Sequence, residues 1–89
     1  MREEVTSLQG PVEIYRGHLT IRIPLAAGGD KFVGCTRGIG EIEGEFLNII
    51  IRPWLAEKLG LCAGSLVSID NNNGKFNMSP IAAEESDLA

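Results

Sequence analysis

The chain has 89 residues, of which 44% are hydrophobic and 22% are charged, and its formal net charge is −4. It is shorter than an ordinary domain of about 100–150 residues, so we expect one small domain with a thin core. Disorder requires low hydrophobicity and high net charge, and this composition has neither. No apolar stretch approaches the roughly 18 residues of a membrane span, and the acidic start does not resemble a secretory signal. We therefore expect a soluble, cytoplasmic protein that does not bind membranes.

The acidic excess lies at the two ends of the chain. Two acidic residues lie in the first ten positions and three in the last nine, whereas residues 5–80 carry seven acidic and seven basic side chains. We expect a flexible leader over residues 1–10, a single small domain over 11–80 and an acidic flexible tail over 81–89. An acidic chain lacks the overall positive charge that favours nucleic acid, although a local basic patch remains compatible with it.

Alternation of apolar and polar residues predicts strands in the first half of the chain. Residues 12–15 alternate briefly and residues 18–23 alternate cleanly, with the period of two that is typical of a half-buried strand. Pro24 ends the second strand because proline cannot donate to a sheet. Residues 26–30 are expected to form a loop and residues 31–36 a further strand. The strand over 18–23 places two sets of side chains on opposite faces: Leu19, Ile21 and Ile23 against His18, Thr20 and Arg22.

The middle of the chain predicts a buried strand followed by one helix. Residues 46–51 contain three consecutive isoleucines, which favours a strand buried on both faces. Pro53 suits the first turn of a helix over residues 53–59. Leu55 and Leu59 are spaced to share one face of that helix. We expect both leucines to pack against three apolar strand residues: Ile49, Ile51 and Val67.

An asparagine–glycine pair predicts a hairpin in the last third. Residues 66–69 and 75–79 are expected to be its two arms, because Asn73-Gly74 tolerates positive φ at little cost. Pro80 ends the second arm. Together these elements predict a mostly β fold with about six or seven short strands and one short helix, arranged as a small β-barrel.

Two strand segments also resemble one another. Residues 19–24 and 47–53 are both apolar strands that run into a proline, at an offset of twenty-eight. A duplicated strand–turn unit and chance similarity between two apolar strands both remain open.

Residues 44–80 resemble the AbrB/MazE/SpoVT family of swapped-hairpin domains. The resemblance covers about two-fifths of the chain. It consists of a strand, a short proline-started helix, Leu-Gly-Leu-x-x-Gly, a strand, an Asn-Gly turn, a strand and a proline. It implies a barrel of the AbrB-like, cradle-loop type, which relatives close by interleaving two chains, and a small DNA-binding regulator or antitoxin-like protein. The residues that match are Ile49, Ile51, Pro53, Leu55, Glu57, Lys58, Leu59, Gly60, Leu61, Gly64, Val67, Ile69, Gly74, Lys75 and Pro80.

Three positions depart from the family pattern. Arg52 stands where proline is usual, Ala56 where arginine is usual and Ser65 where an acid is usual. The family's arginine helps to hold the dimer or approaches the DNA backbone, so its absence weakens both expectations. Residues 11–43 have no counterpart in a minimal family domain and could supply the other half of the barrel. A monomer with an internally closed barrel and an interleaved homodimer both remain open.

No constellation of residues predicts catalysis, a cofactor or a metal site. His18 is the only histidine, and a metal site built on it would need carboxylates from elsewhere. The glycines around Ile39 lack the spacing of a phosphate-binding loop. Cys35 and Cys62 are too few for a disulfide framework, and we expect them to stay unpaired without a catalytic role. Three alternating acids favour a solvated strand face over acid–base chemistry: Glu41, Glu43 and Glu45.

The protein is therefore expected to be a non-enzymatic binding module. If His18, Thr20 and Arg22 shared a face with Arg37, a patch that contacts phosphate would exist. The alternative to duplex DNA is a protein partner or self-assembly without nucleic acid. Trp54 is expected in the core rather than on a partner surface, since aromatic residues are scarce here. Four arginines are the candidate DNA contacts, with the first two leading: Arg22, Arg37, Arg16 and Arg52.

Overall fold

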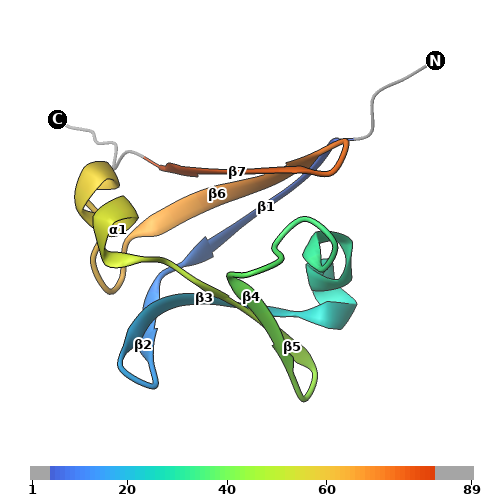
Figure 1. Cartoon of the computed structure of the whole chain (residues 1–89), viewed down its shortest axis with the longest axis horizontal. Coiled ribbons are helices and arrows are strands. Elements are labelled where there is room, and N and C mark those ends of the chain that lie inside the picture. Colours follow the sequence, from blue (N-terminus) through green and yellow to red (C-terminus); the bar gives the residue numbers. More distant parts are fainter. Residues whose placement is uncertain (1–4, 82–89) are drawn as a thin grey trace, which may run out of the picture.

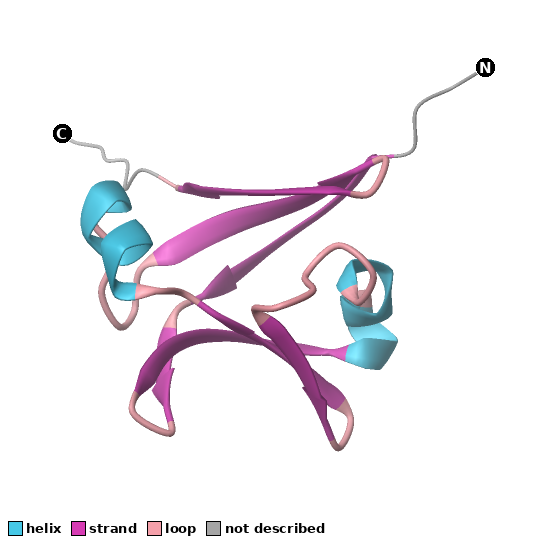
Figure 2. Cartoon of the chain, viewed as in Figure 1, coloured by secondary structure: helices cyan, strands magenta, loops and turns pink. Residues whose placement is uncertain are grey.

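The structure is a computed structural model that describes residues 5–81. Over these residues the fold is mostly β, as predicted, with seven strands and one α-helix, and Figure 2 shows how strands dominate. The strands form a three-stranded sheet in the order β1-β6-β7 and a four-stranded sheet in the order β2-β3-β5-β4, all neighbours antiparallel. The elements are β1 (Val5–Pro11), β2 (Glu13–Tyr15), β3 (His18–Pro24), β4 (Gly40–Glu43), β5 (Phe46–Ile50), α1 (Pro53–Leu59), β6 (Leu66–Asn72) and β7 (Lys75–Pro80).

The two sheets are joined where the chain passes from β1 into β2 (Figure 1). Val12, at this junction, is 2% exposed. Its N–H donates to the Ser65 carbonyl at 2.8 Å, and its own carbonyl accepts from the Gly64 N–H at 2.7 Å. The junction is thereby tied to the loop before β6. The strands within residues 5–81 form these two sheets, and no closed barrel is found among them.

The expectation of a flexible leader over residues 1–10 is wrong for its second half. Strand β1 begins at Val5 and pairs with β6 along its whole length, from Val5 opposite Asn72 to Pro11 opposite Leu66. Leu8 is the large apolar residue that β1 packs against the core. One such residue in a polar segment gives only a weak pattern. Residues 1–4, and the expected tail apart from Ile81, lie outside the described residues.

The strand predicted over residues 31–36 is also wrong. A short 3₁₀-helix, Leu25–Ala27, precedes this region, and a second one, Gly29–Phe32, runs into it and is followed by a turn over residues 33–35. Between them, Gly28 has φ 112°, a conformation that favours glycine. Phe32 is fully buried, and its carbonyl accepts a 2.8 Å hydrogen bond from the Thr36 hydroxyl. Such a bond over four residues belongs to a helical turn, so the segment is coiled around a buried aromatic side chain.

The core lies between the two sheets and is closed at one end by α1. Strand β5 lies between β3 and β4, and three successive residues of it, 47–49, are buried, as the isoleucine-rich run predicts. Leu55 and Leu59 are half-buried against this core, whereas Ala56 is the buried residue of the helix. Trp54 is 61% exposed, so its expected place in the core is wrong. Its position at the start of a seven-residue helix points it away from the single face that packs.

The predicted hairpin is confirmed between β6 and β7. Asn72 pairs with Lys75, which leaves a two-residue turn of Asn73 with φ 56° and Gly74 with φ 89°. Two successive positive φ angles define the type I′ turn that suits the twist of a hairpin. The two segments that resemble one another in sequence, β3 and β5, are antiparallel neighbours. Among the described residues, no helix is long and apolar enough to cross a membrane.

Candidate binding face of the four-stranded sheet

One face of the four-stranded sheet carries a polar network, and we call it the polar sheet face. The opposite face supplies the core residues Ile21, Ile23 and Ile49. The register places Thr20 opposite Ile50 and Arg22 opposite Asn48, so their side chains share a face. The polar sheet face consists of Glu13, Tyr15, His18, Thr20, Arg22, Glu41, Glu43, Phe46, Asn48 and Ile50.

Glu43, at the end of β4, is the centre of the network. Its carboxylate accepts hydrogen bonds from the Tyr15 hydroxyl and, at 3.0 Å, from the Asn48 amide. It also forms an ion pair with Arg16, which lies in the turn between β2 and β3. The turns of the β2–β3 and β4–β5 hairpins both lie at the bottom of Figure 1, at opposite ends of the β3–β5 pair. These contacts therefore join the two hairpins across the polar sheet face.

Arg22 is held inside the same network. Its Nε donates to the Asn48 side-chain oxygen at 3.0 Å. Its guanidinium carbon lies 4.1 Å from the centroid of the Tyr15 ring and 4.5 Å from that of Phe46, within range for cation–π attraction. Asn48 is only 6% exposed, and its hydrogen bonds to Arg22 and Glu43 offset the cost of burying its amide. Arg22 is thus engaged within the protein, which lowers its availability to a partner.

A hollow of about 270 Å³ opens on the polar sheet face. Thr20, at its base, is 1% exposed and donates its hydroxyl to the His18 carbonyl at 2.9 Å. Thr20 is therefore buried although it lies on the polar face that the alternation predicts for β3. The hollow is lined by Tyr15, Arg16, His18, Thr20, Glu41, Asn48 and Ile50.

Arg37 and Arg52 form a second group of cations. Arg52 lies two residues after Ile50, which lines the hollow. The Arg52 guanidinium donates to the Gly38 carbonyl at 3.4 Å. This contact brings Arg52 beside the loop that carries Arg37. Both arginines are exposed. The only ion pair among residues 5–81 is that of Arg16 with Glu43, so neither arginine of this group has a carboxylate partner there.

The four predicted arginines thus divide into two pairs. Arg16 and Arg22 belong to the polar network, and Arg37 and Arg52 lie beside Gly38. His18, Thr20 and Arg22 do share a face, as the alternation predicts, but Arg37 lies in a loop rather than on the sheet. Sequence reasoning missed three members of the network: Tyr15, Phe46 and Asn48.

The contacts of Glu43 predict a dependence of stability on pH. Hydrogen bonds from Tyr15 and Asn48, together with the charges of Arg16 and Arg22, hold the pKa of the Glu43 carboxyl below its ordinary value of 4.5. A carboxyl whose pKa is lower in the folded state stabilises the fold above its ordinary pKa. This stabilisation is lost as the pH falls through the lowered pKa. We expect Glu43→Gln to weaken the acid-dependent loss of stability, measured as the urea midpoint from neutral pH to below pH 4.5.

The matched control is Glu57→Gln, which removes a carboxylate from the exposed side of α1. This control should keep the acid-dependent loss of the unmodified protein. An unchanged pH profile in Glu43→Gln would contradict the role of the network.

The two cysteines are free. Cys35 is half-buried, and burial raises the pKa of its thiol, which disfavours the reactive thiolate. Cys62 is exposed, and its sulfur lies 3.6 Å from the Ser65 hydroxyl. No group of three or more histidine, cysteine, aspartate or glutamate residues that could hold a metal occurs between residues 5 and 81.

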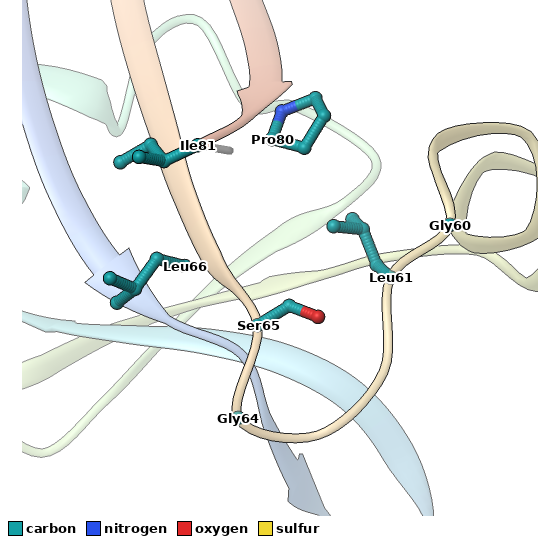
Figure 3. A pocket seen from close by; sticks show the side chains of 7 residues that line it. All are labelled: Gly60, Leu61, Gly64, Ser65, Leu66, Pro80 and Ile81. Carbon is teal, nitrogen blue, oxygen red and sulfur yellow. The ribbon is translucent and has the colours of Figure 1, made fainter. Parts of the chain in front are cut away.

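A second hollow, of about 360 Å³, lies between the loop after α1 and the end of the β6–β7 hairpin. Figure 3 shows Leu61 on the loop, with Leu66 on β6 and Ile81 just after the end of β7. Leu66 is 50% exposed, and the Ile81 N–H donates to its carbonyl at 2.9 Å. The residues that line this hollow include no charged side chain. No protein-family model, curated protein or solved structure matches the chain.

Proposed function

We propose that the protein is a non-catalytic binding module that contacts the phosphate backbone of duplex DNA through Arg37 and Arg52. The observation that carries the proposal is that Arg52 donates to the carbonyl of Gly38, the residue that follows Arg37, and that both arginines are exposed with no carboxylate partner among residues 5–81. Arginine presents a planar fork of donors that matches phosphate geometry. Phosphate contacts of this kind position a protein on DNA without reading its sequence.

The proposal includes an AbrB/MazE/SpoVT-like barrel that stays open at the edge of β1, with the two sheets as its halves. Its support is the order of elements from β5 to Pro80: a strand, a helix with proline at its start, a strand, an Asn-Gly turn and a strand. The passage of the chain from one sheet to the other at Val12 supports the same reading. In such a barrel the strands before β4 take the place that a second chain has in relatives.

The expected affinity is low and depends strongly on salt. Each phosphate neutralised on B-DNA contributes about −0.9 to the slope of log K against log salt. Two free arginines therefore predict a slope of about −2. Arg16 is compensated by Glu43 and Arg22 is held by Asn48, so neither is expected to add a full contact.

The test is the fluorescence anisotropy of a labelled random duplex, measured at several salt concentrations. Arg37→Ala with Arg52→Ala should bring the slope close to zero, since both counterion-releasing contacts are lost. The charge-matched control is Lys58→Ala with Lys75→Ala, which removes two exposed cations from α1 and β7. The control should retain the slope. Absence of binding by the unmodified protein at low salt, or equal loss in both double variants, would refute the proposal.

A protein partner is the second candidate, and exposed apolar side chains favour it. Trp54 is 61% exposed, and tryptophan is enriched among the residues that dominate protein interfaces. Trp54 is the only tryptophan, so its emission reports directly on this surface. A blue shift of that emission with rising protein concentration, in the absence of DNA, would favour this candidate over the first.

A further inference from the structure

The four edge strands of the two sheets differ in how they are protected. An unpaired edge can pair with another chain, and natural proteins commonly block it with charged residues. Strand β7 begins with Lys75, β2 begins with Glu13, and β4 carries Glu41 and Glu43. Strand β1 has the sequence Val-Thr-Ser-Leu-Gln-Gly-Pro and carries no charge. It is therefore the edge of the described sheets that no charge protects.

The outer edge of β1 has no strand partner among the described residues. β6 pairs with one side of β1, and no strand among residues 5–81 pairs with the other. β2 pairs with β3 only as far as Thr20. The rest of β3 pairs with β5 and not with β1, so it does not close this edge. A hollow of about 240 Å³ separates Leu8–Pro11 of β1 from the segment 21–24 of β3. At the other end of β1, Val5 is 54% exposed.

We propose that two copies of this chain associate by antiparallel pairing of β1 with β1 across a two-fold axis. When the pairing is centred on Ser7, Val5 lies opposite Gln9 of the partner subunit. No like charges face each other in this pair, because β1 carries no charged residue. Each copy contributes the same surface, which closes the assembly as a symmetric dimer. The two three-stranded sheets then become one continuous sheet. A second copy is favoured over a charged partner because this edge offers backbone groups and uncharged side chains alone.

The dimer does not depend on the proposed DNA contact, since β1 lies in the other sheet from the polar sheet face. It would, however, place two copies of Arg37 and Arg52 in one particle. If both hold, the salt slope of DNA binding should double when the protein dimerises, to about −4. Failure of DNA binding alone would leave the dimer intact.

Sedimentation velocity of the full chain, from micromolar to millimolar concentration, tests the proposal. The unmodified protein should shift from monomer to dimer over this range. Val5→Lys with Gln9→Lys sets lysine opposite lysine on both sides of the axis, and like charges directly opposite destabilise a strand pair. We expect this variant to dimerise about tenfold more weakly. The control, Asn77→Lys with Ser79→Lys, adds the same charge to exposed positions of β7 and should dimerise as before.

Hydrogen exchange provides a second measurement that does not depend on a variant. The β1 amides that point away from β6 should exchange more slowly as the concentration rises, while those of the β6–β7 pair should not change. A protein that stays monomeric at millimolar concentration would overturn the proposal. Dimerisation that both double variants share, without protection of the β1 amides, would overturn it too.

Discussion

Replacing Phe32 with alanine is expected to destabilise the protein by about 3–5 kcal/mol, the usual cost of removing a fully buried aromatic side chain. Phe32 is completely buried between the sheets. Its ring meets that of Phe76 edge to face, with the centroids 6.3 Å apart, a favourable geometry for two aromatic rings. In a domain with a thin core, this loss is a large share of a total stability of about 5–15 kcal/mol. Urea unfolding followed by circular dichroism measures it.

The control for this substitution is Val33→Ala, at the next position along the chain. Val33 is 37% exposed, so its truncation should change stability by no more than about 0.5 kcal/mol. If Phe32→Ala unfolds at nearly the same urea concentration as the unmodified protein, Phe32 does not anchor the core.

Elements with strong local signals could be predicted from the sequence. The alternation over β3, the proline that starts α1 and the Asn-Gly turn of the last hairpin all depend on residues close together in the chain. Local signals fail where contacts between distant parts of the chain determine the local conformation. Phe32 and its neighbours have the composition of a strand, but burial of the ring and the Thr36 hydrogen bond wind them into a 3₁₀-helix.

The prediction of a flexible leader fails over residues 5–10 for a related reason. Strand β1 has few apolar residues and a nearly polar sequence, so nothing within it indicates a strand. Its conformation is determined by pairing with β6, about sixty residues later in the sequence; Leu8, for example, lies opposite Ile69. Pairing at such a separation leaves no periodic trace in the shorter segment.

The candidate site could be predicted only in part. Residue type alone identifies the arginines, but their distribution into two pairs depends on contacts over long separations. Tyr15 and Glu43 are 28 residues apart, and Arg22 and Asn48 are 26 apart. Asn48 lies in the middle of an apolar run, where the sequence indicates a buried strand and not a polar contact. A buried asparagine needs hydrogen-bond partners, and that requirement was the one available sign of a network at this position.

Gly40→Ala is expected to destabilise the protein by about 3 kcal/mol, because the position has no room for a side chain. A Cβ added at Gly40 would fall against the Thr36 hydroxyl and 2.8 Å from the Thr36 Cβ. Thr36 is 2% exposed and its hydroxyl is bonded to the Phe32 carbonyl, so it cannot move without breaking a buried hydrogen bond. The control is Gly34→Ala, where an added Cβ meets nothing within 4 Å. Gly34→Ala should change stability by no more than about 0.5 kcal/mol.

The same substitution should also disturb the arginine pair beside Gly38. The Thr36 carbonyl accepts from the N–H groups of Ile39 and Gly40, at 3.1 and 2.7 Å, and so fixes the loop that presents Gly38 to Arg52. We expect Gly40→Ala to lower the affinity for duplex DNA under conditions in which the variant is still folded, and Gly34→Ala to leave it unchanged. Thr36→Ala removes the hydroxyl that the new methyl group meets, so the double variant should be more stable than the sum of the two single losses predicts. Additive losses in this cycle would show that Gly40 and Thr36 do not interact. The conformation of this loop would then not depend on their contact.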